Sequence, residues 1–254
     1  MWLEEQVNAG KIGKQADQFN SLQEKLVHQL AVIGKHYNVN HMHFACCQDT
    51  DEDRGTVQYL QDCAKESGLN NDFVFIEDIG LAECGSFSDL QNNKIETLFK
   101  LYPWEFMQRE EFGQSIGPAQ INWLEPIWKS ILSNKALMPM LWKLFPKHPN
   151  LLPAYFEDEL GKATETKLVK KPIFSREGAN ISVIENGKTV LHADGPYGEE
   201  GFIYQAYYPL PQFGNNHTLI GSWLVNDQAA GISVREDSSP ITQDMSRYLP
   251  HIIL

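Results

Sequence analysis

The sequence predicts a mixed α/β (α+β) chain with a helical middle and an antiparallel β section at its end. Up to about residue 100, helix-like and strand-like segments alternate, whereas short apolar strands separated by turns follow one another from residue 167. Alternation favours a layered α/β region, and consecutive short strands favour an antiparallel sheet. We therefore divide the chain into a partial α/β region, residues 1–98, and a helical plus antiparallel region, residues 99–254.

The first predicted helix covers residues 15–37, because its apolar residues recur at helical spacing on one face. These residues are Phe19, Leu22, Leu26, Leu30 and Ile33. A buried strand is predicted over residues 41–47, a second helix over 56–68 with a glycine at its end, and a second strand over 72–80. This order of elements predicts a small α/β layer.

The middle of the chain is expected to be helical over residues 123–153, where Trp and Leu are abundant. Asn134 interrupts this pattern, and Pro146 and Pro149 end it. Strands are then predicted at residues 167–174, 181–185, 188–193, 201–210, 218–225 and 229–236. Asn186 and Gly187 predict a two-residue hairpin turn, since both tolerate a positive φ.

The charge balance disfavours a nucleic-acid partner. The chain carries 33 Asp and Glu residues against 21 Lys and Arg residues, and binding to phosphate backbones depends on basic side chains. No apolar run approaches the roughly 20 residues that span a bilayer, and residues 1–19 lack the pattern of a signal peptide. We therefore expect a cytoplasmic protein with neither a nucleic-acid nor a membrane partner.

The cysteines and histidines predict no metal site. Cys46, Cys47, Cys63 and Cys84 form no Cys-x-x-Cys pair, and we interpret all four as structural thiols. His41 and His43 lie two apart on one strand face without a third and fourth ligand in register, so we interpret them as structural too. The acids of residues 48–55 lack the pattern of a calcium loop and fit either a helix start or a cation pocket.

Two lysines and two arginines are candidates for binding an anion. Lys135 lies among apolar residues near a helix start, and Lys171 ends an apolar strand before a proline. An ammonium in such a setting either reaches solvent or meets an anion, because burying it unpaired is costly. Arg176 in a tight turn and Arg235 at a strand end could bind phosphate, or could instead pair with the neighbouring Glu177 and Glu236.

Several long stretches together resemble the glutathionylspermidine synthase family, in particular its short bacterial members named acid–amine ligases. The resemblance covers essentially the whole chain. The stretches that carry it are FKLYPWE (99–105), residues 124–156, VKKPIFSREGANI (169–181), IYQAYYPLP (203–211), IGSWLVNDQAAGISVRED (220–237) and the final RYLPHII. The resemblance implies an ATP-grasp fold preceded by a small α/β region. It also implies formation of an amide from an acid and an amine through an acyl phosphate, with ATP as the second substrate.

The resemblance also implies roles for individual residues. In the family pattern the two lysines contact the ATP phosphates, the loop at residue 176 covers them, and two later stretches contact adenine. Catalytic roles fall on Arg176 and Arg235. The implied ATP-binding residues are Lys135, Lys171, Glu177, Gly178, Gln205, Ala206, Tyr207, Tyr208, Pro240, Ile241 and Thr242. Glu52 and Asp53 match two acids that face a polyamine, which implies glutathione-like and polyamine-like substrates.

The resemblance places the Mg²⁺ ligands of the family outside the matched positions. In the family an Arg-x-Asp segment and a Glu-x-Asn segment carry them, and both precede the Trp-Leu-Glu that stands here at residues 2–4. We therefore expect an N-terminally truncated form of such a ligase, with ATP and Mg²⁺ as cofactors. The alternative is a nucleotide-binding or interaction module without ligase activity.

Overall fold

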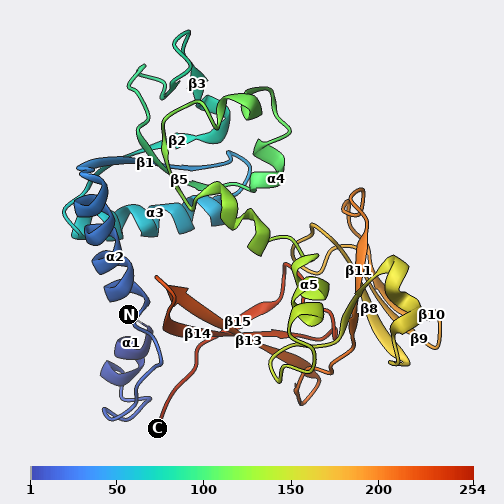
Figure 1. Cartoon of the computed structure of the whole chain (residues 1–254). Helices are drawn as coiled ribbons and strands as arrows, with labels where there is room; N and C mark the ends of the chain where they lie inside the picture. Colours follow the sequence, from blue (N-terminus) through green and yellow to red (C-terminus); the bar gives the residue numbers. More distant parts are fainter. Residues whose placement is uncertain (1) are drawn as a thin grey trace. The chain divides into compact units, whose positions relative to one another are not determined.

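The computed structural model of the protein describes residues 2–254 (Figure 1). The chain forms two compact units. The parallel unit comprises residues 20–130 and 224–231, and the antiparallel unit comprises the described residues before 20 together with 131–223 and 232–254. The first of these units extends beyond residue 98, because one strand of its sheet runs across this position, Thr97–Leu101, and another follows it, Asn122–Leu124.

The parallel unit is built on a four-stranded sheet in the order β2-β1-β5-β6. Its strands are β1 (His41–Cys46), β2 (Asn70–Phe75), β5 (Thr97–Leu101) and β6 (Asn122–Leu124), and all neighbours are parallel. The first two strands confirm the predicted α/β layer. A sheet of this kind buries its central strand on both faces, and β1 is buried at five of its six positions.

Two amphipathic helices pack in the parallel unit. Helix α2 (Leu22–Tyr37) begins seven residues later than predicted, so Phe19 lies outside it and is exposed. Helix α3 (Asp51–Glu66) begins five residues earlier, because the Thr50 hydroxyl caps it by accepting a 3.0 Å hydrogen bond from the Asp53 N–H. The predicted glycine end is confirmed, since Gly68 follows the helix with a φ of +91°.

The core of this unit explains two of the four cysteines. Cys46 and Cys63 are buried with residues of α2, α3 and β1 and with Leu69, which lies between α3 and β2. The residues of the three elements are Leu30, Met42, Phe44, Val57 and Ala64. Burial raises the pKa of both thiols, as expected for structural cysteines. Cys84, also interpreted as a structural thiol, lies exposed in the turn between β3 (Gly80–Leu81) and β4 (Phe87–Ser88), so packing in a core does not explain it.

The antiparallel unit contains a five-stranded sheet in the order β10-β9-β8-β11-β7. Its strands are β7 (Ala154–Phe156), β8 (Lys167–Pro172), β9 (Ile181–Glu185), β10 (Lys188–Ala193) and β11 (Phe202–Ala206), with every neighbour antiparallel. Asn186 and Gly187 join β9 to β10 with φ values of +50° and +76°, which confirms the predicted hairpin turn.

A second antiparallel sheet has the order β12-β13-β14-β15. Its strands are β12 (Gln212–Phe213), β13 (Asn216–Val225), β14 (Gln228–Asp237) and β15 (Arg247–Leu249). The antiparallel β section predicted from the sequence is therefore two sheets. The strands β9 and β10 of the first and β14 of the second lead into the loops that form the candidate site.

The expected helical middle is broken into short pieces. Residues 122–124 form β6 instead of a helix, residues 127–132 form the 3₁₀ turn η3 (Ile127–Leu132), and α5 (Leu137–Leu144) packs against β7 and β11. The interruption predicted at Asn134 is confirmed, since its side-chain oxygen accepts a 2.8 Å hydrogen bond from the Ala136 N–H before α5 begins.

The remaining elements are short. They are α1 (Trp2–Asn8), α4 (Trp104–Met107), and the 3₁₀ turns η1 (Ile76–Asp78), η2 (Glu111–Ser115) and η4 (Glu157–Lys162). Within residues 2–254, none of the helices combines the length and the apolar character that crossing a bilayer requires.

Candidate nucleotide-binding site

Lys171 and Gln205 meet on one face of the five-stranded sheet. Strand β11 pairs Ile203 with Lys171 and Gln205 with Val169, so the two polar side chains are diagonal neighbours. The Lys171 ammonium donates a 2.8 Å hydrogen bond to the Gln205 amide oxygen. Burial lowers the pKa of Lys171, because an ammonium loses hydration there and its partner is neutral. This arrangement leaves a cation whose charge is not balanced by a carboxylate among the described residues.

Lys135 ties the start of α5 to the segment that follows β8. Its backbone N–H donates a 2.9 Å hydrogen bond to the Ile173 oxygen, and its ammonium donates a 2.5 Å hydrogen bond to the Ser175 oxygen. The second bond ends at the first residue of a loop, residues 175–180, which we call the β8–β9 loop. Of the two predicted phosphate lysines, Lys171 therefore lies on the strand that leads into this loop, and Lys135 contacts the first residue of the loop.

The β8–β9 loop is a tight turn in a left-handed conformation. Glu177, Gly178 and Asn180 have φ values of +55°, +70° and +53°, and the Ala179 N–H donates a 2.9 Å hydrogen bond to the Arg176 oxygen. Ala179, between Gly178 and Asn180, has no positive φ, so left-handed residues alternate with another conformation here. Such alternation within a turn can direct neighbouring backbone N–H groups towards a common side, as in anion-binding turns. The predicted phosphate-covering loop thus has a backbone suited to an anion.

Gly178 allows the loop to approach the segment of residues 240–242. A Cβ atom at this glycine would lie 2.6 Å from the Thr242 oxygen and 2.9 Å from Cγ2 of Ile241. Any side chain at position 178 would therefore displace backbone as well as strain its own positive φ. The structure brings together two stretches that the resemblance connects with one ligand.

The segment of residues 240–242 is held by Asp237 at the end of β14. The Asp237 carboxylate accepts hydrogen bonds from the N–H of Ser239 at 2.8 Å and of Gln243 at 3.2 Å, and from the Ser246 hydroxyl. Burial alone would raise the pKa of Asp237, but the bonds from Ser246, Ser239 and Gln243 and the charge of Arg235 outweigh it and lower the pKa.

Ile241 is the apolar centre of this region. It is buried with Val183 of β9 and Ala193 of β10, and Tyr207 packs against the same cluster. Val183 pairs with Val169, so the cluster covers the sheet face that also carries Lys171 and Gln205. An apolar surface beside the unbalanced charge of Lys171 suits a ligand with a flat ring at one end and an anionic group at the other.

Arg235 supports the neighbouring backbone rather than pairing with Glu236. Its Nη2 donates hydrogen bonds of 2.7 Å to the Gln243 oxygen and 3.3 Å to the Asp244 oxygen, and its guanidinium lies over the Tyr248 ring at 5.0 Å. Glu236 instead accepts a 3.3 Å bond from Arg247, so the alternative of an Arg235–Glu236 ion pair is wrong.

The predicted adenine segment, residues 205–208, leaves β11 with its backbone anchored on both sides. The Ala206 N–H donates to the Pro153 oxygen at 2.8 Å, and the Tyr207 N–H donates to the Lys167 oxygen at 3.1 Å. The Lys167 ammonium lies 4.5 Å from the Tyr207 ring centroid. Tyr208 is 70% exposed, so Tyr207 is the ring of this pair that faces the apolar cluster.

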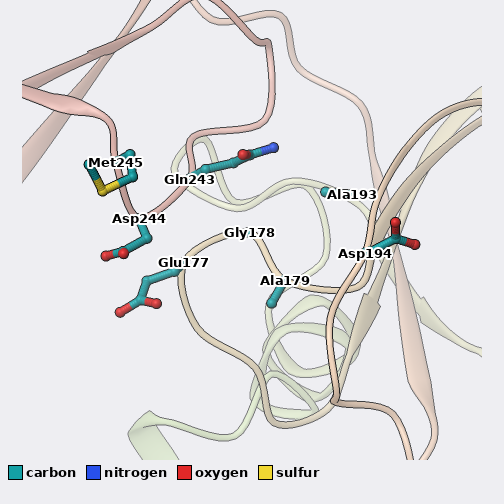
Figure 2. Close-up of a pocket in the computed structure, with 8 residues that line it drawn as sticks. All are labelled: Glu177, Gly178, Ala179, Ala193, Asp194, Gln243, Asp244 and Met245. Carbon is teal, nitrogen blue, oxygen red and sulfur yellow. The ribbon is translucent and has the colours of Figure 1, made fainter. Parts of the chain in front are cut away.

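A pocket lies beside the glycine of the β8–β9 loop (Figure 2). Figure 2 shows the side chains of Glu177 and Asp244 at one end of this pocket and that of Asp194 at the other. The pocket is lined by Glu177, Gly178, Ala179, Ala193, Asp194, Gln243, Asp244 and Met245. Its three carboxylates would repel a phosphate, so an anion would bind on the lysine side of the loop and a cationic group would suit the pocket.

Glu52 and Asp53 belong to the parallel unit, in the first turn of α3. Glu52 is exposed and Asp53 is partly exposed, and three acids occupy this turn. Acids at a helix start are stabilised by the helix dipole, so their position fits the structural alternative as well as a role with a cationic substrate.

Sequence reasoning missed the residues that hold the loops. Ser175 contributes a backbone oxygen, which no residue type signals, whereas Asp237 and Ser246 carry a signal that was not used. Asp237 begins an Asp-Ser-Ser-Pro sequence, and Asp followed by Ser and Pro is typical of a side-chain-capped turn.

The prediction that His41 and His43 lack a third ligand is also corrected. Asp72 of β2 pairs with His43 of β1, and potential ligand atoms of His41, His43 and Asp72 all lie within 4.8 Å of one another. Pairing of the two strands brings together His43 and Asp72, which are 29 positions apart in the sequence. The spacing of residues along a single strand does not reveal such a contact.

Residues 1–254 match the family model described as "Glutathionylspermidine synthase preATP-grasp". This chain belongs to the glutathionylspermidine synthase family. A protein of Haemophilus influenzae named "Putative acid--amine ligase" is 41% identical over 247 residues, which cover 94% of this chain and 63% of that protein. Trypanothione synthetase of Crithidia fasciculata is 30% identical over 221 residues, covering 76% of this chain and 33% of that protein. The chain therefore spans less than two thirds of the length of these family members.

The fold of this family member also resembles a solved structure. A protein of Methylobacillus flagellatus, described as a "Putative gamma-glutamylcysteine synthetase", matches with a TM-score of 0.56 and covers 92% of this chain and 74% of its own. The two sequences are only 11% identical, so the likeness concerns the fold alone. It confirms the ATP-grasp type of fold expected from the sequence.

Proposed function

We propose that this chain is part of an ATP-dependent acid–amine ligase and that its antiparallel unit binds the nucleotide. Membership of the family supports the reaction class, and the two relatives carry ligase and synthetase names. In such a reaction a carboxylate oxygen attacks the γ-phosphorus of ATP and ADP leaves. The amine nitrogen then attacks the acyl carbon, phosphate leaves and an amide remains.

The observation that carries the proposal is the state of Lys171. Its ammonium is partly buried, has only the neutral Gln205 amide as a hydrogen-bond partner, and has its pKa lowered by burial. Holding a cation in this way costs free energy in the free protein. A phosphate oxygen would offset that cost by a charge-assisted hydrogen bond, which is stronger than the bond to a neutral amide.

Two sets of neighbouring groups would contact the two ends of the proposed ligand, its phosphates and its adenine. Lys135, Lys171 and the N–H groups of the β8–β9 loop would neutralise and orient the phosphates, and Arg176 would reach the reacting carboxylate. Adenine would lie against the cluster of Ile241, Val183 and Tyr207. Catalysis of phosphoryl transfer rests mainly on such positioning and charge neutralisation, so these residues need supply no covalent step.

The described residues do not fit a Mg²⁺ site. Mg²⁺ prefers oxygen ligands in near-octahedral geometry, and the convergent group of potential ligands found among residues 2–254 contains two histidines. The carboxylates of Glu177 and Asp194 lie at opposite ends of the pocket (Figure 2). No step of the proposal therefore passes through the metal.

Lys171→Met tests the nucleotide site, with Lys170→Met as its matched control. Lys170 is the adjacent lysine of β8 and lies on the opposite face, where its ammonium contacts the Phe202 ring at 4.0 Å. Titration calorimetry with ATP should show binding weakened by about 10- to 100-fold for Lys171→Met, the value of one charge-assisted hydrogen bond. Lys170→Met should bind as the wild type does. Equal binding by the two variants would contradict the nucleotide site.

A second candidate function is nucleotide binding without turnover. The absence of a convergent set of oxygen ligands in the described residues favours it. The two functions differ in one measurement, which is ADP release from ATP and Mg²⁺ in the presence of pooled carboxylic acids and amines. Ligase activity predicts release that requires both an acid and an amine, whereas a binding module predicts ATP binding with no acid- and amine-dependent ADP.

A further inference from the structure

We propose that His41, His43 and Asp72 form a binding site for a divalent transition-metal ion of the zinc type. The site lies in the parallel unit and is independent of the proposed nucleotide site. Its residues come from the paired strands β1 and β2, and potential ligand atoms of all three lie within 4.8 Å of one another. Two imidazoles and one carboxylate are a ligand set that zinc accepts, whereas Mg²⁺ and Ca²⁺ prefer oxygen alone.

The sheet places the three side chains on one face. In the parallel register His43 is the partner of Asp72, and His41 precedes His43 by two residues, so both imidazoles point to the same side of β1. The rings of His41 and His43 have centroids 4.9 Å apart and an interplanar angle of 76°. His41 Nε2 lies 2.9 Å from Asp72 Oδ2. Strand geometry therefore sets the spacing without any loop.

His43 supplies the observation that points to a ligand. Only 2% of the residue is exposed, and its Nδ1 is buried with no hydrogen-bond partner among the described residues. A buried polar atom without a partner costs free energy, and native structures rarely leave one without a reason. The neutral imidazole nitrogen is a strong zinc ligand, and metal binding would give this atom its missing partner.

The other nitrogen of His43 is held by a carboxylate. Its Nε2 lies 3.4 Å from Asp89 Oδ2, and Asp89 is itself buried at 7% exposure. Asp89 also accepts hydrogen bonds from the N–H groups of Gln91 at 2.9 Å and Asn93 at 2.8 Å, and from the Asn93 side chain at 2.9 Å. A carboxylate behind a histidine fixes the proton on Nε2 and leaves Nδ1 as a ligand, as in many zinc sites. Asp89 is therefore a positioning residue.

The mouth of the site is open to solvent. The side chains of His41 and Asp72 are 39% and 63% exposed, in contrast to His43. An ion could enter from this side, and water could occupy the fourth position of a tetrahedron. Ligand atoms around tetrahedral zinc lie roughly 3.3 Å apart, as bonds of about 2.0–2.1 Å require. His41 Nε2 and Asp72 Oδ2, 2.9 Å apart, are already close to this spacing.

Zinc affinity of the metal-stripped chain tests the site. A competition titration against a chromophoric chelator should give one bound Zn²⁺ per chain, and Co²⁺ should give the intense visible absorption of tetrahedral coordination. His41→Gln and Asp72→Asn should each lower the affinity at least tenfold. Both residues are on the surface, so their loss should leave the fold intact, which the unfolding temperature in the presence of chelator verifies.

His192→Gln is the matched control, because His192 Nε2 also lies 3.0 Å from a carboxylate, that of Asp194, but has no second histidine beside it. This variant should bind Zn²⁺ as the wild type does. Asp89→Asn should lower the affinity roughly 10- to 100-fold and shift the Co²⁺ spectrum, as loss of a positioning carboxylate does. The proposal is overturned if wild-type affinity survives in His41→Gln and Asp72→Asn, or if His192→Gln weakens binding equally.

Discussion

Lys171 reaches across from β8 to β11 and donates a 2.8 Å hydrogen bond to the amide oxygen of Gln205. The bond satisfies one of the three N–H donors of the ammonium but does not balance its positive charge, and burial lowers the pKa of Lys171. In a protein that binds a polyanion, such a residue favours the complex at the expense of the free protein.

We expect Lys171→Met to raise the stability of the free protein while removing its response to ATP. The methionine avoids the dehydration of an ammonium, and the free energy of unfolding should rise by on the order of 1 kcal/mol. Lys170→Met should instead lower it by about 0.5–1 kcal/mol, because its ammonium loses contact with the Phe202 ring. Thermal unfolding with and without ATP measures both effects. A destabilised Lys171→Met that still responds to ATP would contradict this account.

Gly178→Ala should destabilise the antiparallel unit more than Gly187→Ala does. Both glycines have a positive φ, of +70° and +76°, so both variants bear the cost of a left-handed alanine, about 1 kcal/mol. Only Gly178 has a neighbour in the way, since its Cβ would lie 2.6 Å from the Thr242 oxygen, whereas Gly187 has nothing within 4 Å. The difference between the two unfolding free energies, from urea titrations, measures the close approach. An equal decrease in unfolding free energy for the two variants would show that the backbone at Thr242 moves without cost to accommodate the Cβ atom.

Asp237 should contribute to acid stability. Its folded pKa is lowered, so its stabilising contribution is fully present above the unfolded value of 3.8 and is lost as pH falls through the folded pKa. Asp237→Asn removes this contribution, and the difference in unfolding free energy between wild type and variant should shrink below about pH 4. Urea unfolding from neutral to acid pH measures it. Asp62→Asn, which removes an exposed carboxylate on α3, is the control and should show a smaller effect.

Lys100 should make the parallel unit more stable at alkaline pH. Burial lowers the pKa of Lys100 to about 8, although Glu105 opposes the shift, and its ammonium lies 3.6 Å from the Trp104 ring. Between about pH 8 and its unfolded value of 10.5, the unfolded chain binds more protons, so stability rises with pH in this window. The full difference corresponds to roughly 3 kcal/mol.

Lys100→Met isolates this effect. The variant has no ammonium to dehydrate, so its unfolding free energy relative to wild type should fall between about pH 8 and pH 10.5. Lys94→Met serves as the control, since Lys94 is exposed and pairs with Glu96 at 3.5 Å. Its stability difference from wild type should stay nearly constant over the same range. A flat difference for Lys100→Met would show that the ammonium is hydrated in the folded protein.

Local patterns predicted the elements whose cause is local. Asn186 and Gly187 determine their hairpin because both accept a positive φ. The mostly apolar run at residues 41–47 forms a strand over His41–Cys46 that is buried at five of its six positions. Hydrophobic periodicity gave wrong element bounds or types where a helix cap or a partner strand determines the secondary structure. Residues 122–124 join the edge of the parallel sheet beside β5, and the Trp and Leu pattern of that region does not reveal this pairing.

In the candidate site, too, some features could be predicted from residue types and others depend on the tertiary structure. Residue types pointed to Lys135, Lys171 and Arg176, because cations in apolar or glycine-bearing settings are unusual enough to notice. They could not indicate that the Lys171 ammonium has a neutral partner, that Gly178 touches Thr242, or that Asp237 holds the intervening turn. Each of these depends on atoms from distant parts of the chain.

By itself, then, the sequence determined the α/β and antiparallel composition of the protein, its family and the cations of its proposed nucleotide site. Only the tertiary structure decided that the charge of Lys171 faces a neutral partner and that His43 acquires carboxylates on both sides. Asp72 meets His43, and Asp89 lies behind it, through strand pairing and loop return. The physical reason is that hydrophobic and dihedral preferences act over a few residues, whereas pKa values, ligand sets and close approaches depend on groups that folding alone brings together.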